Sequence, residues 1–156
     1  LAAQTVVAIT TVYLHYASTP RLPVPMHGLA GGTAHWLFDR DAINGNSGVI
    51  AAVISCSDAL DDLTQQDLID RVTADVQQID PAAGVPLSAR VITEKRATFA
   101  ATLGRPVPKR RLDAVKYGYL AGDWTHWAYP ATLEGAVQSG ESAARLLLRD
   151  WNDEDR

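Results

Sequence analysis

A glycine and an acidic residue stand side by side near the end of the chain, in the run AGDWT, and a stretch of small residues, PATLEGAVQSG, follows shortly after. Residues 117–121 predict the end of a buried strand, after which Gly122 frees the backbone. Asp123 would then stand at the carboxyl edge of a sheet, where α/β proteins bind their ligands. Asp123 is therefore the first candidate for ligand binding.

The element expected after the aromatic loop of residues 124–129 is a helix, and Pro130 suits its first turn. Apolar residues then recur on one helical face, at Leu133, Ala136, Val137, Gly140, Ala144, Leu147 and Leu148. Because glycine and alanine keep this face thin, a flat or anionic ligand could approach the N–H groups of the first turn. The same pattern also fits a strand, loop and helix packed for structure alone, with Thr132 or Asp123 as a cap.

The two motifs together resemble the C-terminal flavin-binding segment of the FAD-dependent amine oxidase and desaturase superfamily, and within it the squalene-associated group of hydroxysqualene dehydroxylases. The resemblance implies that Asp123, with Gly122 and Trp124 beside it, hydrogen-bonds the ribityl and pyrophosphate part of FAD. It also implies that the helix start approaches the pyrimidine edge of the flavin ring, through Pro130, Ala131, Thr132 and Leu133. A helix N-terminus there would stabilise the negative charge of reduced flavin.

The loop between the two motifs departs from that family. Where the family usually has Thr-Gly-Leu before the proline, this chain has His126, Trp127, Ala128 and Tyr129. The loop beside the flavin is therefore expected to be bulkier, with His126 and Tyr129 as candidates for substrate contact. No residue is assigned a catalytic role, and Glu134 is expected to cap the helix rather than act as a base.

A second motif resembles the substrate domain of the same group, and is formed by Gly31, Gly32, Trp36, Phe38, Asp39 and Arg40. Trp36 and Phe38 are two residues apart in an expected strand and therefore share one face. They could line a groove for a long hydrocarbon or fill the core of the sheet. The string EKRATFA also resembles this group, and its charges either shape the substrate pocket or protect an edge strand. Arg105 and Pro106 approximate an Arg-Pro pair of the family, to which no role is assigned.

The rest of the chain predicts an α/β fold of α+β character: a mixed, largely antiparallel substrate-domain sheet with a covering helix, plus the C-terminal strand and helix of a Rossmann-like FAD domain. Strands are expected at residues 5–16, 34–39, 48–56 and 87–99, with a turn signal at Asn44-Gly45. Thr64 and Asp67 form an approximate capping box for a helix that ends before Pro81. The expected domains are residues 1–104 (substrate binding), 105–150 (part of the FAD domain) and 151–156 (an acidic tail that frays).

Composition excludes several classes of protein. The chain has 156 residues and a formal net charge of −4, so nucleic acid is not an expected partner. The single cysteine, Cys56, rules out an internal disulfide, fits a reducing compartment and is expected in the core. The four histidines, including His27 in an expected loop, lack metal-binding spacing, so no metal site is expected. With no apolar run near the ~18 residues that cross a bilayer, the expected location is cytoplasmic, with peripheral contact at the inner face of the membrane left open.

The phosphate-binding fingerprint GxGxxG is missing from the sequence. Because that motif lies near the N-terminus in the flavin superfamily, the chain is expected to be roughly the C-terminal third of an enzyme whose N-terminal remainder supplies the phosphate cradle. The segment alone should be catalytically silent. The resemblance implies reductive removal of the hydroxyl of hydroxysqualene, an apolar isoprenoid, on the route to hopanoids or carotenoids. A carotenoid (phytoene-type) desaturase, a flavin amine oxidase and a non-catalytic binding or structural module lacking the nucleotide domain remain alternatives.

Overall fold

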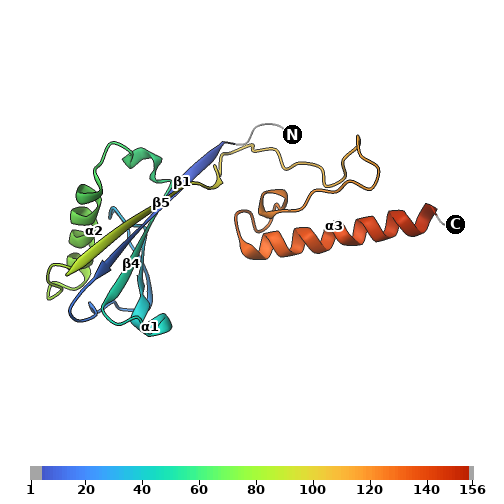
Figure 1. Cartoon of the computed structure of the whole chain (residues 1–156). Helices are drawn as coiled ribbons and strands as arrows, with labels where there is room; N and C mark the ends of the chain where they lie inside the picture. The colour runs from blue at the N-terminus through green and yellow to red at the C-terminus, as the bar shows by residue number, and fades with distance from the viewer. Residues whose placement is uncertain (1–4, 155–156) are drawn as a thin grey trace. The chain divides into compact units, whose positions relative to one another are not determined.

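The computed structural model describes residues 5–154 of the chain (Figure 1). The chain divides into two compact units: Val6–Thr98 form the first, and the residues from Phe99 onward belong to the second. The first unit contains most of the strands, and the second contains the long helix that ends the chain.

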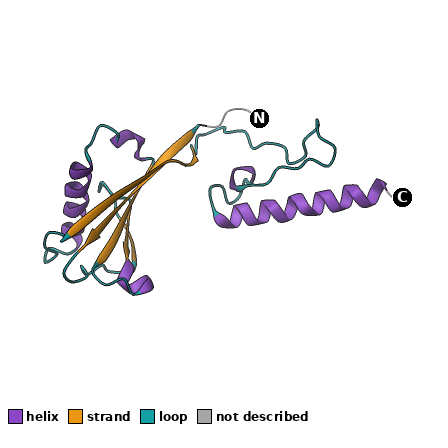
Figure 2. Ribbon diagram, in the orientation of Figure 1, coloured by secondary structure: helices purple, strands orange, loops and turns teal. Residues whose placement is uncertain are grey.

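A sheet, drawn in orange in Figure 2, forms the first unit. It has five strands in the order β2-β3-β4-β1-β5. Its strands are β1 (Val6–His15), β2 (Met26–Gly28), β3 (Trp36–Asp39), β4 (Val49–Ser55) and β5 (Ser88–Phe99). The β1–β4, β3–β4 and β2–β3 pairs are antiparallel. At the other side of β1, the N–H of Leu87 donates to the carbonyl of His15 at 2.7 Å, next to the start of β5. The expectation of a largely antiparallel sheet is confirmed.

One helix, α2 (Gln65–Ile79), covers one face of this sheet. Alternate residues of β1, among them Val12 and Leu14, are fully buried, as expected for a strand with one face in the core. Val72 and Val76 of α2 belong to the same buried cluster. This cluster is the core of the first unit.

The capping box predicted for α2 is confirmed. The Thr64 hydroxyl accepts the N–H of Asp67 at 3.1 Å, and the Asp67 carboxylate accepts the N–H of Thr64 at 2.9 Å. The Thr64 hydroxyl also donates to the Asp67 carboxylate at 2.6 Å, and this bond, together with the one from the Thr64 N–H, lowers the pKa of Asp67 by stabilising the charged form. The helix ends before Pro81, as predicted.

The turn predicted at Asn44-Gly45 is wrong in kind, because a short helix, α1 (Arg40–Asn44), connects β3 to β4. Asp39 starts this helix by accepting the N–H groups of Asp41 and Ala42. Gly45 ends it in a left-handed conformation with φ 75°. The glycine is therefore a helix C-cap and not part of a tight hairpin turn.

Two smaller predictions for the first unit are also wrong. Cys56 is exposed rather than buried, because β4 ends one residue earlier and Cys56 adopts a left-handed conformation with φ 52° before the 3-10 helix η1 (Ser57–Leu60). His27 lies in a short strand rather than a loop, since β2 pairs it with Leu37.

The second unit contains the 3-10 helix η2 (Asp123–Thr125) and the helix α3 (Leu133–Glu154). The strand predicted at residues 117–121 is represented only by an isolated bridge between Arg111 and Tyr119. The acidic tail was predicted to fray from residue 151, but α3 continues to Glu154, and the ring of Trp151 lies 5.3 Å from that of Tyr117. Residues 155–156 lie outside the described part of the chain.

Candidate functional site

The Gly-Asp motif forms a tight turn fastened to α3. The N–H of Gly122 donates to the Ser139 hydroxyl at 2.7 Å, and Ser139, which is fully buried, donates in turn to the carbonyl of Ala136 at 2.7 Å. The Thr125 hydroxyl closes the turn by donating to the carbonyl of Gly122 at 2.7 Å. A Cβ at Gly122 would lie 2.5 Å from Nε1 of Trp124, so only glycine fits against the indole. These contacts hold the turn in one place on the helix.

Asp123 opens η2 directly after this turn and is half-buried. Within the described residues its carboxylate makes no hydrogen bond or ion pair, and only its backbone carbonyl accepts an N–H, that of His126. The two carboxylate oxygens are therefore available to accept hydrogen bonds from a ligand with hydroxyl groups, such as the ribityl chain of FAD.

The start of α3 differs from the prediction, because Pro130 precedes the helix instead of lying in its first turn. Ala131 adopts a left-handed conformation with φ 57°, so regular helix begins only at Leu133. The Thr132 hydroxyl caps this start by accepting the N–H of Gly135 at 3.0 Å. The side chain of Leu133 is 88% exposed. The first turn of α3 is thus accessible, and its N–H groups lack intrahelical partners.

At Gly135 the backbone of the loop closely approaches that of the helix. A Cβ added at Gly135 would lie 2.0 Å from the carbonyl oxygen of Tyr129. No side chain fits there without moving the backbone. Gly135 of the PATLEGAVQSG motif therefore has a structural role, whereas the prediction that the motif leaves room for a ligand stays a prediction. Glu134 lies in the first turn of the helix, as predicted.

The bulky loop before Pro130 is organised around His126. This side chain is buried, its Nδ1 accepts the N–H of Tyr129 at 3.1 Å, and the two rings stack 5.7 Å apart. Trp127 is 79% exposed and Tyr129 50% exposed. Substrate contact by His126 or Tyr129 stays a prediction, and His126 already uses one ring nitrogen inside the loop.

Arg105 supports the turn in a way that sequence reasoning missed. Its guanidinium carbon lies 4.0 Å from the centre of the Phe99 ring, and its Nη1 donates to the carbonyl of Trp124 at 3.1 Å. Stacking fixes the plane of the guanidinium, so the remaining donors point in a fixed direction. The only signal in the sequence was the Arg-Pro pair, which does not reveal a contact to a residue 19 positions away.

The first unit brings the other predicted pair together on one surface, the open sheet face, which lies opposite α2. Leu37 is buried in the core, so its neighbours Trp36 and Phe38 point to the other face, where they pair with Val53 and Ala51. Trp36 is 41% exposed and its ring lies over Gly28. The prediction that Trp36 and Phe38 share a face is confirmed.

The charged triplet of EKRATFA lies on β5, at the edge of the sheet. Glu94, Lys95 and Arg96 are all exposed, and Glu94 accepts the N–H of Arg96 at 3.1 Å. Charges along an edge strand hinder pairing with other chains. This location fits the protective role.

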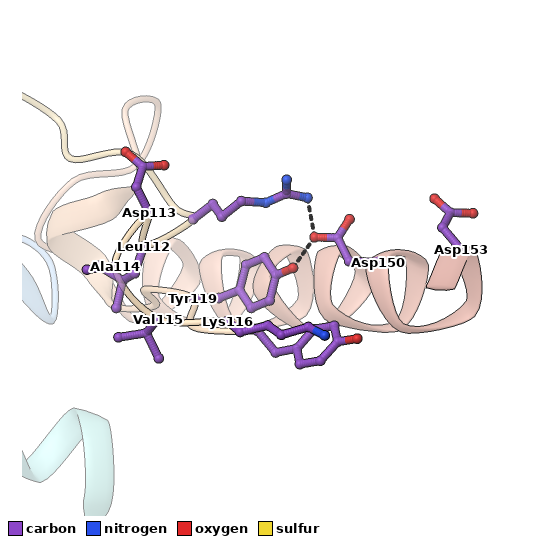
Figure 3. Close-up of a pocket in the computed structure, with 10 residues that line it drawn as sticks. Leu112, Asp113, Ala114, Val115, Lys116, Tyr119, Asp150 and Asp153 are labelled. Atoms are coloured by element: carbon purple, nitrogen blue, oxygen red, sulfur yellow. Dashed lines mark hydrogen bonds and ion pairs between the residues drawn. The ribbon is translucent and has the colours of Figure 1, made fainter. Parts of the chain in front are cut away.

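A cavity of about 590 Å³ lies near the C-terminal end of α3 (Figure 3). At its wall the Asp150 carboxylate accepts hydrogen bonds from both Arg111 and the hydroxyl of Tyr119. Donation to this carboxylate raises the pKa of Tyr119 and lowers that of Asp150. Because these two groups already engage Asp150, the cluster fastens the preceding loop to α3 and is not a separate reactive centre.

The described residues contain no group of three or more metal-ligating side chains that could hold an ion. They also contain no helix that is long and apolar enough to cross a membrane.

Comparison with protein families gives a context to the Gly122–Asp123 turn on α3 and to the open sheet face. The family model for flavin-containing amine oxidoreductases matches residues 3–148. The chain therefore belongs to this family of FAD-dependent oxidoreductases.

Sequence matches to individual relatives point to a particular enzyme within this family. The chain is 35% identical over 138 residues to a hydroxysqualene dehydroxylase of Zymomonas mobilis, a match that covers 86% of this chain and 31% of the relative. It is 34% identical over 148 residues to a hydroxysqualene dehydroxylase of Rhodopseudomonas palustris, covering 90% of this chain and 32% of the relative. The chain thus spans about a third of the length of the curated relatives that it matches.

Among solved structures, a putative protoporphyrinogen oxidase from Exiguobacterium has a similar fold. The TM-score is 0.66 at 17% sequence identity, and the match covers 94% of this chain and 36% of that chain. At this identity the similarity shows the fold alone, and it agrees with the mixed α/β fold class.

Proposed function

We propose that this chain is the C-terminal part of a hydroxysqualene dehydroxylase and that it contributes the flavin-binding segment together with one wall of the substrate site. The observation that carries the proposal is the turn at Gly122, held on α3 by Ser139, which leaves the Asp123 carboxylate without a partner among the described residues. Two relatives that are 35% and 34% identical to this chain are both named hydroxysqualene dehydroxylase, which supports the proposal.

The proposed FAD contacts are those that the family resemblance implies, and this geometry is compatible with them. Asp123 would accept hydrogen bonds from the ribityl hydroxyls, with Gly122 and Trp124 shaping the turn beside it. The open first turn of α3, with Pro130, Ala131, Thr132 and Leu133 at its entrance, would face the flavin ring. The dipole of a 22-residue helix favours negative charge at that end. The phosphate cradle would come from an N-terminal remainder of the same enzyme, since GxGxxG is missing here.

The proposed reaction replaces the hydroxyl of hydroxysqualene by hydrogen. The C–O bond would break, a hydride equivalent would form the new C–H bond, and the hydroxyl would leave with one proton as water. Two electrons for this step would come from FAD bound in its reduced form. The protein has to hold a long apolar substrate in one orientation and keep water away from the reacting carbon.

The open sheet face is the proposed wall for the hydrocarbon. Trp36 and Phe38 present aromatic surface, and Met26, which pairs with Phe38, extends it to the edge of the sheet with 49% of its side chain exposed. Exposed apolar surface of this kind marks a site for an apolar partner. Peripheral contact with a membrane, from which such a substrate would be collected, is part of the proposal, as is the division into a substrate domain over residues 1–104 and part of the FAD domain over residues 105–150.

The test is a reaction with defined substrates. The full-length enzyme, reduced under anaerobic conditions, is incubated with hydroxysqualene. The same enzyme with its flavin oxidised is incubated in air with phytoene or with a primary amine, because desaturation and amine oxidation consume oxidised flavin. The products are identified by mass spectrometry. The proposal predicts squalene from hydroxysqualene in an amount set by the reduced flavin, and no conversion of the other two compounds. Turnover of phytoene or the amine in place of hydroxysqualene would contradict it.

A further inference from the structure

We propose that Tyr13 recognises the hydroxyl group of the substrate and thereby fixes the position of the apolar chain on the open sheet face. This inference rests on the proposed function, because it names a specificity residue of that same site. Tyr13 belongs to none of the motifs by which the sequence resembles its family.

Tyr13 lies in a row of side chains that crosses four strands. Its partner in the ladder is Ala51 of β4, Ala51 is paired with Phe38 of β3, and Phe38 with Met26 of β2. Directly paired residues of antiparallel strands point to the same face of a sheet. Tyr13 is therefore on the open sheet face, with Phe38 two strands away and the small side chain of Ala51 between the two rings.

The surroundings of Tyr13 on this face are mostly apolar. In the neighbouring row, Val53 lies next to Thr11 and Trp36. On β5, Thr93 faces α2, since its hydroxyl is hydrogen-bonded at 2.8 Å to that of the buried Thr10. Ile92, the residue before Thr93, therefore points to the open sheet face, where its side chain is 46% exposed.

The phenol is the polar group of this row. Tyr13 is half-buried, and its hydroxyl has no hydrogen-bond partner in the part of the chain that the structure describes. A phenolic hydroxyl both donates and accepts, and that of Tyr13 is open to a ligand because it is not enclosed by the described residues. One polar group beside an aromatic and aliphatic surface matches the chemistry of hydroxysqualene, a long hydrocarbon that carries one hydroxyl.

This arrangement assigns a selection step to Tyr13. The hydrocarbon part of the substrate would lie along Trp36 and Phe38, and the hydroxyl would hydrogen-bond to the Tyr13 phenol. Squalene, the product, lacks the hydroxyl and would leave the phenol unpaired. A site that hydrogen-bonds a hydroxyl discriminates against the analogue that lacks it. Tyr13 thus favours binding of the substrate over retention of the product.

The test compares two ligands in the full-length enzyme. Dissociation constants for hydroxysqualene and squalene are measured by tryptophan fluorescence for the wild type, Tyr13→Phe and Tyr16→Phe. Tyr16 is the matched control, since it is buried in the core on the α2 side of the sheet. We expect Tyr13→Phe to weaken hydroxysqualene binding by about fivefold, the value of one neutral hydrogen bond, and not to weaken squalene binding, because squalene leaves the phenol unpaired. Tyr16→Phe should change neither.

The outcomes separate this inference from the function on which it rests. If the wild type prefers hydroxysqualene and Tyr13→Phe keeps that preference, the assignment of Tyr13 is overturned while the proposed function stands. Equal weakening of both ligands would also overturn it, because the ring would then act only by packing. A wild-type enzyme that binds neither ligand would overturn the proposed function itself.

Discussion

Removing the Ser139 hydroxyl tests whether the flavin-binding turn depends on its attachment to α3. In Ser139→Ala the N–H of Gly122 loses its 2.7 Å acceptor at a fully buried position. An unsatisfied buried donor costs about 1–3 kcal/mol, and alanine returns about 0.5 kcal/mol through its higher helix propensity. The net loss is about 0.5–2.5 kcal/mol, which corresponds to a decrease in FAD affinity of about 2- to 70-fold if the turn must be formed for binding.

The matched control is Ser142→Ala, three residues further along the same helix, where the side chain is half-buried and hydrogen-bonds no other described residue. It should gain only the propensity of alanine. The assay is urea unfolding of the full-length protein with and without FAD, together with FAD titration followed by quenching of flavin fluorescence. If the two variants have the same FAD affinity and the same free energy of unfolding, the Gly122–Ser139 contact does not hold the site, and the reasoning is refuted.

Two other changes test neighbouring parts of the fold. Gly135→Ala places a Cβ 2.0 Å from the carbonyl oxygen of Tyr129, so we expect a loss of about 1–3 kcal/mol in the free energy of unfolding measured in urea. The control Gly140→Ala, whose Cβ would meet no atom within 4 Å, should stabilise α3 by about 0.5–1 kcal/mol. Equal effects of the two substitutions would contradict the close approach at Gly135. Burial raises the pKa of Tyr16 from 10.0 to about 12, although the nearby Thr73 hydroxyl opposes the rise. Its hydroxyl has no well-formed hydrogen bond among the described residues. Because the unfolded chain loses this proton at a lower pH than the folded chain, the free energy of unfolding should fall between pH 10 and about pH 12. Tyr16→Phe should remove that part of the decline in unfolding curves measured at alkaline pH. An unchanged slope would show that Tyr16 is not its cause.

Local patterns in the sequence were sufficient for much of the first unit. The strand β1, with its many β-branched and aromatic residues, the capping box at Thr64 and the helix that ends before Pro81 each depend on residues a few positions apart. The shared face of Trp36 and Phe38 follows from the two-residue period of a strand. These features were predictable because neighbours in the sequence determine them.

Features that depend on distant partners could not be predicted in this way. Ser139 and Arg105 contact the turn from 17 and 19 residues away, and no local pattern announces either contact. Asn44-Gly45 carries the signal of a hairpin turn, but Asp39 starts a helix before it and makes the glycine a C-cap. Strand formation at residues 117–121 needs neighbouring strands, and the pairing present among the described residues is the bridge to Arg111.

The central claim, that Asp123 and the start of α3 belong to an FAD site, is tested most directly by the visible absorption spectrum of the full-length protein after gel filtration. The wild type and Asp123→Ala are compared with Asp113→Ala, which changes an exposed carboxylate of the same unit. The account predicts a flavin spectrum for the wild type and Asp113→Ala, and a loss of most of the bound flavin in Asp123→Ala with the fold retained by circular dichroism. A folded wild type without flavin, or an Asp123→Ala variant with its full complement, would contradict it.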